Sequence, residues 1–345
     1  MARNFKELLE RKIVQLAKLP LKNEFDIERL DELDGYTVPI IAHDYGAKTP
    51  LMWNTVYEGL GFKIRNIMIV VDPKHLSEVV KTFKEDPKYL GGGAGVGFKE
   101  IIIPYLDAKR PEDLTSVNLI VKEGKSLIGY NTDSRGLYTS VKEALGKQKK
   151  EVKGSNFLIF GAGGVAKEFA RHLAQNEAER IVIVNRTYNK AVALAHELNV
   201  QFERNLAFGL PEDLIRGSVL NTVKKSDAII NCTDKGSDGN LIDTSAFAAA
   251  GEYNNSLSIE NLRLLKHWNP SVVIVDIVLP KKGRSITLRH AESVNLENLV
   301  DGIPMVVNQA APAYKLVETA YSDLHKKKLD EEKILDIMRK AVYSK

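Results

Sequence analysis

Residues 157–175 read FLIFGAGGVAKEFARHLAQ. The first four residues predict a buried strand, and Val165–Gln175 has the apolar spacing of a helix. One interpretation of the segment is a glycine-rich turn that only packs. The strand before it and the helix after it favour a dinucleotide-binding turn instead. In such a turn Gly161 allows the tight bend, Gly163 allows close approach of a pyrophosphate, and Ala166 lets the helix pack on the strand. The phosphates would face the positive end of a helix over residues 164–175. The predicted dinucleotide contacts are Gly161, Ala162, Gly163, Gly164, Val165 and Ala166.

The next predicted strand, Ile181–Asn185, ends in polar residues that distinguish the two nicotinamide dinucleotides. An acidic residue at this point would bind the ribose hydroxyls and repel a 2′-phosphate. The chain instead continues with Arg186 and Thr187, and Lys190 follows. Arginine and lysine donate charge-assisted hydrogen bonds to phosphate. The sequence therefore predicts that Asn185, Arg186, Thr187 and Lys190 bind NADP; for Arg186 an ordinary surface position is the alternative.

Strands and helices alternate through this half of the chain. A helix is predicted over 190–198, and strands are predicted over 228–232 and 272–278. Because parallel strands need a helical crossover, this alternation produces a parallel sheet with helices on both faces. We expect a Rossmann-type, doubly wound α/β domain over residues 150–303. Residues 202–225 are interpreted as an insertion with a helix of its own.

A second α/β domain is predicted before it, because a chain of 345 residues suits two domains. We assign residues 35–146, completed by helices within 304–345, to a substrate-binding domain. Residues 1–34 carry apolar residues at helical spacing and are predicted as a helical extension. The elements predicted in the domain are strands 36–43 and 64–71, helices 51–60, 74–88 and 134–146, and a hairpin of strands 117–121 and 126–130.

The composition excludes several classes of protein. Hydrophobic residues make up 44% and charged residues 27%, the balance of a globular protein. No apolar run reaches the ~18–20 residues of a membrane helix, and the N-terminus lacks the apolar core of a signal peptide. A net charge of +4 without a basic stripe argues against a nucleic-acid partner. The single cysteine, Cys232, excludes an internal disulfide, and the histidines show no ligand spacing, so we predict a cytoplasmic protein without a metal site.

Motifs in both predicted domains resemble those of the shikimate/quinate 5-dehydrogenase family. The clearest is Gly129-Tyr130-Asn131-Thr132-Asp133, which matches the family's GxNTD. The turn at 161–166 and the segment 185–187 match its GAGGxA and NRT motifs. Four further segments resemble family motifs. Thr49–Asn54 is similar to SP-x-x-HN, and Ile230–Thr233 is similar to INAT. Asp276–Val278 is similar to the start of DxVY, and Met305–Tyr314 is similar to ML-x-x-Q-A-x-x-A-F.

The resemblance implies reversible hydride transfer between NADP(H) and a secondary alcohol or ketone of an alicyclic hydroxy acid, such as shikimate or quinate. It also implies a Lys–Asp pair at a cleft between the domains, and Lys99 and Asp133 occupy the matching positions. A surface lysine and a turn or cap residue are the alternatives for these two. A proton must leave or join the oxygen as the hydride moves, and a lysine can transfer it when its pKa falls well below about 10.4. Burial must supply that decrease, because a neighbouring carboxylate raises the pKa.

The same resemblance implies substrate contacts and further cofactor contacts. Cys232 and Thr233 join the cofactor site, and Thr49, Asn118 and Gln309 join the substrate site. Ordinary, internally satisfied polar residues are the alternative for the last three. The resemblance implies a role in aromatic amino acid biosynthesis, a small-molecule substrate and no membrane partner, and a homodimer is one expected assembly.

Some family positions carry other residues here. A site that pairs hydroxyls and a carboxylate rejects other molecules by leaving its polar groups unpaired, so these losses bear on the substrate. We also expect the glycine run over 91–97 to make the loop before Lys99 unusually flexible, because each glycine adds backbone freedom. The divergent positions are Ala47, Trp53, Gly93, Gly95, Gly97 and Leu279.

Three functions therefore remain under consideration. The retained Lys99, Asp133 and cofactor motif favour an active NADP-dependent oxidoreductase. The lost substrate contacts favour a catalytically weak, NADP-binding sensor or regulatory protein with the same fold. A methylene-tetrahydrofolate or glutamyl-tRNA type reductase is disfavoured, because its substrate motifs do not occur and Cys232 lies in the cofactor half.

Overall fold

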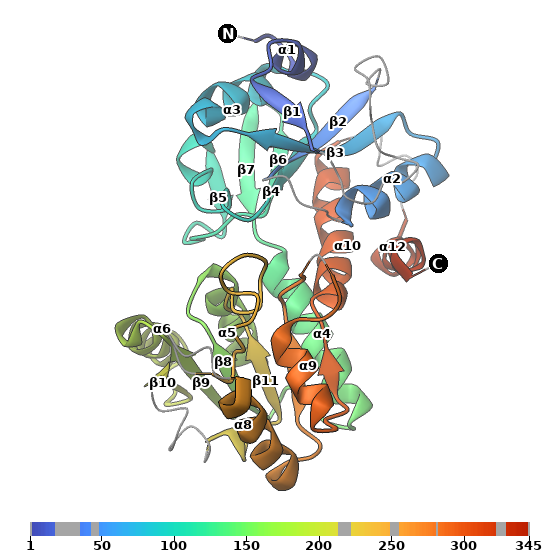
Figure 1. The fold of residues 1–345 in the computed structure, drawn as a ribbon. Coiled ribbons are helices and arrows are strands. Elements are labelled where there is room, and N and C mark those ends of the chain that lie inside the picture. The colour runs from blue at the N-terminus through green and yellow to red at the C-terminus, as the bar shows by residue number, and fades with distance from the viewer. Residues whose placement is uncertain are drawn as a thin grey trace. The chain divides into compact units, whose positions relative to one another are not determined.

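The structure is a computed structural model that describes residues 2–17, 35–42, 48–212, 222–248, 255–280, 282–321 and 329–343. The chain forms two compact units, each with its own sheet (Figure 1). Unit 1 comprises Met1–Asp133 and Val306–Lys345, and unit 2 comprises Ser134–Met305. Among the described helices, none combines the length and the apolar character that a membrane crossing requires.

Unit 2 contains a six-stranded sheet, and every neighbouring pair in it is parallel. The strand order is β10-β9-β8-β11-β12-β13, so the order reverses between β8 and β11. This is the doubly wound arrangement, which confirms the predicted fold class, and such sheets bind ligands at the carboxyl ends of the strands beside the reversal. The strands are β8 (Asn156–Phe160), β9 (Arg180–Asn185), β10 (Ala207–Pro211), β11 (Ala228–Asn231), β12 (Val273–Asp276) and β13 (Leu299–Val300).

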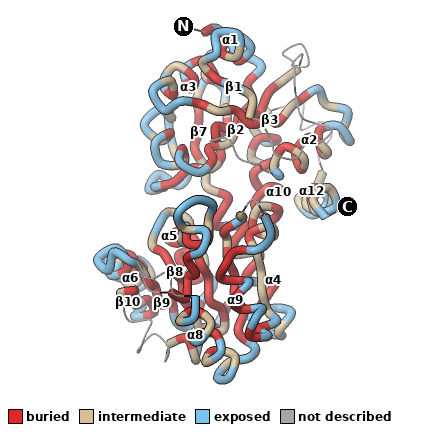
Figure 2. The backbone as a smooth tube through the Cα atoms, viewed as in Figure 1, coloured by how far each residue is buried: buried red, intermediate tan, exposed pale blue. Residues whose placement is uncertain are grey.

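Helices cover both faces of this sheet, as the alternation of side chains along β8 shows. Phe157 and Ile159 belong to one core, whereas Leu158 and Phe160 belong to the core on the opposite face. Figure 2 shows the central strands β8, β9, β11 and β12 as mostly buried segments, as expected of a parallel sheet covered on both faces. The helices are α4 (Asp133–Lys147), α5 (Gly164–Gln175), α6 (Tyr188–Gln201), α8 (Asn255–Trp268) and α9 (Ile286–Ser293).

Unit 1 contains a seven-stranded mixed sheet in the order β1-β3-β2-β4-β6-β7-β5. The predicted hairpin is present, since β6 and β7 pair antiparallel across Gly124 and Lys125. The strands are β1 (Val14–Leu16), β2 (Tyr36–Ala42), β3 (Ile64–Val71), β4 (Gly91–Ala94), β5 (Ala108–Arg110), β6 (Leu119–Glu123) and β7 (Ser126–Tyr130). The helices are α1 (Phe5–Glu10), α2 (Thr49–Gly59), η2 (Pro73–His75), α3 (Leu76–Glu85), η3 (Ile103–Tyr105), α10 (Ile303–Ala320) and α12 (Glu331–Tyr343). Helix α10 belongs to unit 1 from Val306 onward.

The N-terminal segment is helical over a shorter stretch than its spacing predicts. Helix α1 ends at Glu10, and Lys12 adopts a left-handed backbone conformation with φ of 57°. Val14–Leu16 then forms an edge strand antiparallel to β3. The prediction of a helix is therefore wrong for β1, because pairing with β3 overrides the local apolar spacing. Residues 18–34 of the predicted extension lie outside the described part of the chain.

Much of the glycine run before Lys99 is ordered, which corrects the prediction of a flexible loop. Gly91–Ala94 forms β4, which lies between β2 and β6. A Cβ atom on Gly92 would lie 2.1 Å from the carbonyl oxygen of Pro39, so only glycine fits at this close approach. Gly95 continues the order, because its N–H donates to the carbonyl of Ile41 at 2.7 Å.

Two further predictions need correction at unit 2. Residues 202–225 contain β10, which extends the parallel sheet beside β9 and is not an insertion. The Asn199 side chain positions this strand, because it accepts from the N–H groups of Leu206 and Ala207 and donates to the carbonyl of Ala207. A helix was predicted within the same range of 202–225, of which residues 213–221 lie outside the described part of the chain. Helix α4 also packs in unit 2 through Leu137 and Val141, whereas we assigned it to the first domain.

Candidate functional site

Lys99 and Asp133 form an ion pair in unit 1, with Lys99 Nζ against Asp133 Oδ2. Lys99 follows the buried Phe98, and its carbonyl accepts from the Val117 N–H at 2.8 Å, so the lysine backbone is tied to the segment that precedes β6. Asp133 is the first residue of α4, whose positive end stabilises a carboxylate. The lysine and aspartate side chains remain 24% and 11% exposed, so a molecule from solvent can reach the pair.

Asn118 holds the aspartate in place. Its side-chain amide donates to Asp133 Oδ1 at 2.9 Å and to Thr132 Oγ1 at 3.0 Å, and its oxygen accepts from the Thr132 N–H at 2.8 Å. Asn131 shapes the same turn, because it donates to the Ser116 carbonyl and accepts from the Asp133 N–H. Both amide protons of Asn118 are thus used within the protein, which makes it a positioning group for Asp133.

Gln309 joins this cluster from α10. Thr132 Oγ1 donates to Gln309 Oε1 at 2.8 Å, and the glutamine amide donates to the carbonyl of Val306 at 3.2 Å. The structure therefore brings four sequence-predicted residues of unit 1 together through Thr132, a residue that the sequence analysis did not single out. The signal was available, since Thr132 lies within the matched GxNTD segment. This cluster consists of Lys99, Asn118, Thr132, Asp133 and Gln309.

Other positions on the substrate side lie apart from the cluster. Thr49 is the half-buried first residue of α2, and no hydrogen bond between described residues joins its side chain to the cluster. Trp53 is buried, and its ring centroid lies 6.0 Å from that of Tyr57 and 5.6 Å from that of Tyr314. The residue at the family's histidine position is thus part of the aromatic core of unit 1. Leu279 is 45% exposed in unit 2.

The predicted phosphate-binding turn, residues 161–166, connects β8 to α5. Gly161 has a φ of +108°, and a Cβ atom there would lie 2.9 Å from the carbonyl oxygen of Cys232. Gly163 is the N-cap of α5, makes no side-chain capping bond, and has open space where a Cβ would be. Ala166 is buried against the sheet. The first N–H groups of α5 are therefore free of a side-chain cap, which is the arrangement that binds a phosphate at a helix N-terminus.

The residues predicted to select NADP follow β9. Asn185 is the last strand residue, and its amide donates to the Thr187 carbonyl at 2.9 Å. Thr187 is the N-cap of α6 and makes no side-chain capping bond. Arg186 and Lys190 are exposed, and neither forms an ion pair within the described ranges. Two cations thus stand beside a second uncapped helix end, which is a suitable environment for a phosphate.

Cys232 and Thr233 form the loop after β11, next to the phosphate-binding turn. The N–H of Cys232 donates to the Phe160 carbonyl at 2.8 Å, and a Cβ on Gly161 would also meet Thr233 Cγ2 at 3.3 Å. Burial raises the pKa of the Cys232 thiol, and the nearby Asp276 charge adds to this increase. The Cys232 thiol is therefore uncharged, and the residue contacts the phosphate-binding turn through its backbone.

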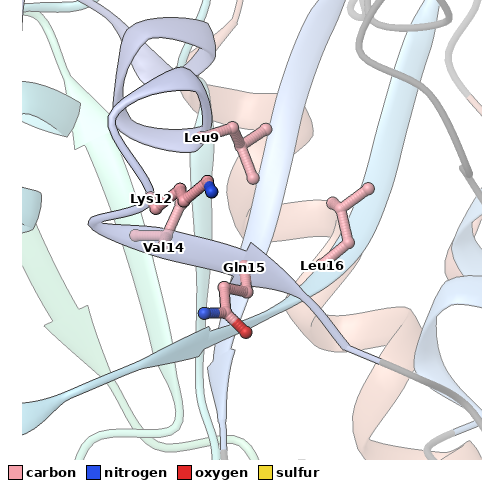
Figure 3. A pocket seen from close by; sticks show the side chains of 5 residues that line it. All are labelled: Leu9, Lys12, Val14, Gln15 and Leu16. Atoms are coloured by element: carbon pink, nitrogen blue, oxygen red, sulfur yellow. The ribbon is translucent and has the colours of Figure 1, made fainter.

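A surface hollow in unit 1 lies outside this site (Figure 3). It is open and offers a single charged side chain, and none of its residues belongs to the predicted site. Among the described residues, no group of three or more His, Cys, Asp or Glu side chains could hold a metal ion. The lining residues are Leu9, Lys12, Val14, Gln15 and Leu16.

Comparisons with known proteins agree on one family. Residues 143–301 match the sequence model of the family Shikimate / quinate 5-dehydrogenase. The NADP(+) shikimate dehydrogenase of Methanocaldococcus jannaschii is 31% identical over 275 residues, which cover 78% of this chain and 86% of the relative. That of Caldanaerobacter subterraneus subsp. tengcongensis is 30% identical over 270 residues, with 78% and 86% covered. A crystal structure of a shikimate dehydrogenase in complex with NADP+ superposes with a TM-score of 0.67 at 24% identity, over 90% of this chain and 96% of that one.

Proposed function

Because this chain belongs to the shikimate/quinate 5-dehydrogenase family, we propose that it is an NADP-dependent oxidoreductase acting on a secondary alcohol. Its substrate is a small alicyclic hydroxy acid of the shikimate or quinate type, which it interconverts with the corresponding ketone. The observation that carries the proposal is the partly exposed Lys99–Asp133 pair, held by Asn118. We infer that unit 2 binds the cofactor and unit 1 binds the substrate.

Lys99 supplies the proton transfer. In the direction of ketone reduction, the carbonyl carbon receives a hydride and the oxygen receives a proton from Lys99 Nζ. Alcohol oxidation reverses both steps, so Lys99 takes the hydroxyl proton. Asp133 pairs with Lys99 and so holds the lysine side chain in position for this transfer. NADPH, when bound, supplies the hydride.

The other residues of the cluster keep this pair in one geometry. Asn118 fixes Asp133 Oδ1, which leaves Oδ2 for the lysine. Thr132 connects the cluster to Gln309 on α10, so the helix and the loop after β7 are held together. Such preorganisation matters because catalytic groups act only when they lie within hydrogen-bonding reach of the reacting oxygen.

The chain's residues fit NADP in unit 2. The close approach at Gly161, the uncapped start of α5 and the pair Arg186 and Lys190 provide sites for a pyrophosphate and a 2′-phosphate. Asn185 and Thr187 shape the turn that presents the arginine. We infer that the cofactor lies at the carboxyl ends of β8, β9 and β11, beside the reversal of strand order.

The test is an assay of NADPH formation, by its absorbance, with NADP+ and a panel that contains shikimate and quinate. We expect turnover of at least one of these acids. Absence of turnover with every acid, although calorimetry detects NADP+ binding, would contradict the proposal and favour the sensor or regulatory function. Apolar residues such as Trp53 and Leu279 replace polar residues of the family motifs, so the panel also determines which acid this protein prefers.

The remaining expectations rest on the same family membership. We infer a cytoplasmic enzyme that participates in aromatic amino acid biosynthesis. A homodimer stays a prediction, and light scattering of the purified chain tests it.

A further inference from the structure

Asp276 is a buried carboxylate that the proposed mechanism does not use. It is the last residue of β12, it pairs in register with Asn231 at the end of β11, and it is 0% exposed. Both residues therefore lie at the carboxyl edge of the unit 2 sheet, and Asn231 is the one that neighbours β8, the strand that leads into the phosphate-binding turn. A buried carboxylate is costly unless hydrogen bonds satisfy it, so its partners indicate what it holds.

Four neutral donors converge on this carboxylate. Oδ1 accepts from the Asn231 amide at 2.9 Å and from the Val278 N–H at 3.0 Å. Oδ2 accepts from Ser285 Oγ at 2.6 Å, and the hydroxyl of Thr287 also donates to the carboxylate. The partners come from the ends of two strands and from the start of α9. All four groups donate in this arrangement, so the ionised, acceptor-only carboxylate is the form that matches it.

Asn231 connects Asp276 to the loop after β11, which contains Cys232 and Thr233. Since its amide nitrogen faces Asp276, its oxygen faces the loop and accepts from Thr233 N at 3.0 Å and from Thr233 Oγ1 at 2.6 Å. The same loop presses its Cys232 carbonyl against Gly161, where no Cβ would fit. A chain of contacts thus runs from Asp276 through Asn231 and the loop to the phosphate-binding turn.

We propose that ionised Asp276 is a positioning residue that holds the loops after β11 and β12 in the conformation that binds NADP. The inference rests on the proposed cofactor, but it does not require turnover. Loss of the negative charge weakens the hydrogen bond that orients Asn231, because a neutral carboxyl is a poorer acceptor than a carboxylate. An asparagine at 276 also places an amide donor where one carboxylate oxygen now accepts. Either change loosens the Asn231 side chain and its hold on Thr233.

The charges around Asp276 leave it without a cationic partner in this set. Burial raises its pKa to about 6 against the opposing effect of its hydrogen bonds. Cys232 and Lys235 follow β11; the thiol has a raised pKa, and the lysine pairs with Glu212. On α9, Arg289 is exposed and His290 contacts Ser258. Asp276 therefore loses its charge as the pH falls through about 6, and NADP affinity falls with it.

The experiment is calorimetric titration of the full chain with NADP+ at pH 7.5 and pH 5.5, for the wild type and for Asp276→Asn. We expect the variant to bind about tenfold more weakly at pH 7.5. At pH 5.5 most of the wild-type protein has Asp276 protonated, so the ratio between the two Kd values for NADP+ falls to about threefold. The 2′-phosphate itself titrates near pH 6, and this contribution is common to both proteins. In the turnover assay the variant raises KM for NADP+ with kcat nearly unchanged.

Asp227→Asn is the matched control, because Asp227 lies at the amino end of β11 and accepts from the Asn156 N–H. It lowers the melting temperature and leaves the Kd for NADP+ unchanged. If Asp276→Asn fails to fold, Asn231→Ala cuts the same link and must also weaken NADP+ binding. Equal Kd values in the wild type and the folded variant, or a ratio that does not change with pH, overturn the inference. NADP+ binding without turnover overturns the proposed function alone, and a wild type that does not bind NADP+ overturns both.

Discussion

At the scale of single residues, we propose that one arginine accounts for the choice of cofactor. Arg186 is exposed beside the start of α6 and forms no ion pair within the described ranges, so its guanidinium is available to a phosphate. We expect Arg186→Ala to raise the Kd for NADP+ by about 10–100-fold, because hydrogen bonds to charged groups contribute roughly 1.5–3 kcal/mol. The affinity for NAD+ should stay within about twofold, since NAD+ lacks the 2′-phosphate.

Arg180 offers the matched control. It lies at the opposite end of β9, where its guanidinium stacks 4.3 Å above the ring of Phe208. Arg180→Ala removes the same charge from unit 2 and should leave both affinities unchanged. If the two arginine variants weaken NADP+ equally, the general charge of the unit, and not the position of Arg186, determines the affinity.

Asp276 also makes the stability of the fold depend on pH. Burial raises its pKa to about 6, whereas an unfolded aspartate titrates near 3.9. Between these values the folded state binds more protons than the unfolded state, so this group adds stability as the pH falls from about 6 to about 4. Relative to Asp276→Asn, the wild type should gain roughly 1–2 kcal/mol in its free energy of unfolding between pH 7 and pH 5. Urea titrations at both pH values measure this, and a constant difference contradicts it.

At the scale of elements, β4 depends on close contact between backbones. A Cβ on Gly92 would lie 2.1 Å from the Pro39 carbonyl oxygen, so Gly92→Ala must displace β4 from β2. We expect a loss of about 1–3 kcal/mol in the free energy of unfolding, measured by urea titration. Gly59→Ala is the control, because Gly59 ends α2 with open space around it and should gain up to about 1 kcal/mol.

The elements that the sequence predicts well are those with strong local patterns. The apolar run of β8 and the helical spacing of α5 place the phosphate-binding turn correctly, and β3 is predicted with its exact bounds, 64–71. Strands β1, β4 and β10 are missed for one reason. Each gains its stability from pairing with a distant strand, and glycine in β4 and β10 lowers the local strand preference.

The candidate site shows the same limit. Family motifs indicate Lys99, Asn118, Asp133 and Gln309, which the structure brings together within unit 1. The motif over residues 129–133 contains Thr132, but it does not reveal that the Thr132 hydroxyl donates to Gln309, which lies 177 positions further along the chain. The contact between Asn231 and Asp276 is equally remote from local sequence, since it depends on two parallel strands being neighbours.

At the scale of the whole molecule, we propose that one unit binds the cofactor and the other carries the catalytic pair. Unit 2 contains the phosphate-binding turn and the basic residues after β9, whereas unit 1 contains the Lys99 cluster. Each unit has its own hydrophobic core. The proposed reaction needs both, so variants in unit 2 should change cofactor affinity and variants in the cluster should change the rate of the chemical step.

The most direct measurement is the initial rate of NADPH formation by the wild type and by Lys99→Ala at saturating NADP+, with shikimate and with quinate. We predict that the wild type forms NADPH with at least one of these acids. In the variant kcat should decrease by about 10²–10⁴-fold, because the proton acceptor is removed. Its Kd for NADP+ should stay within about twofold. Lys84→Ala, which breaks a comparable ion pair with Asp107 in unit 1, should keep the wild-type rate. A Lys99→Ala protein that also keeps the wild-type rate would contradict the role of the Lys99–Asp133 pair.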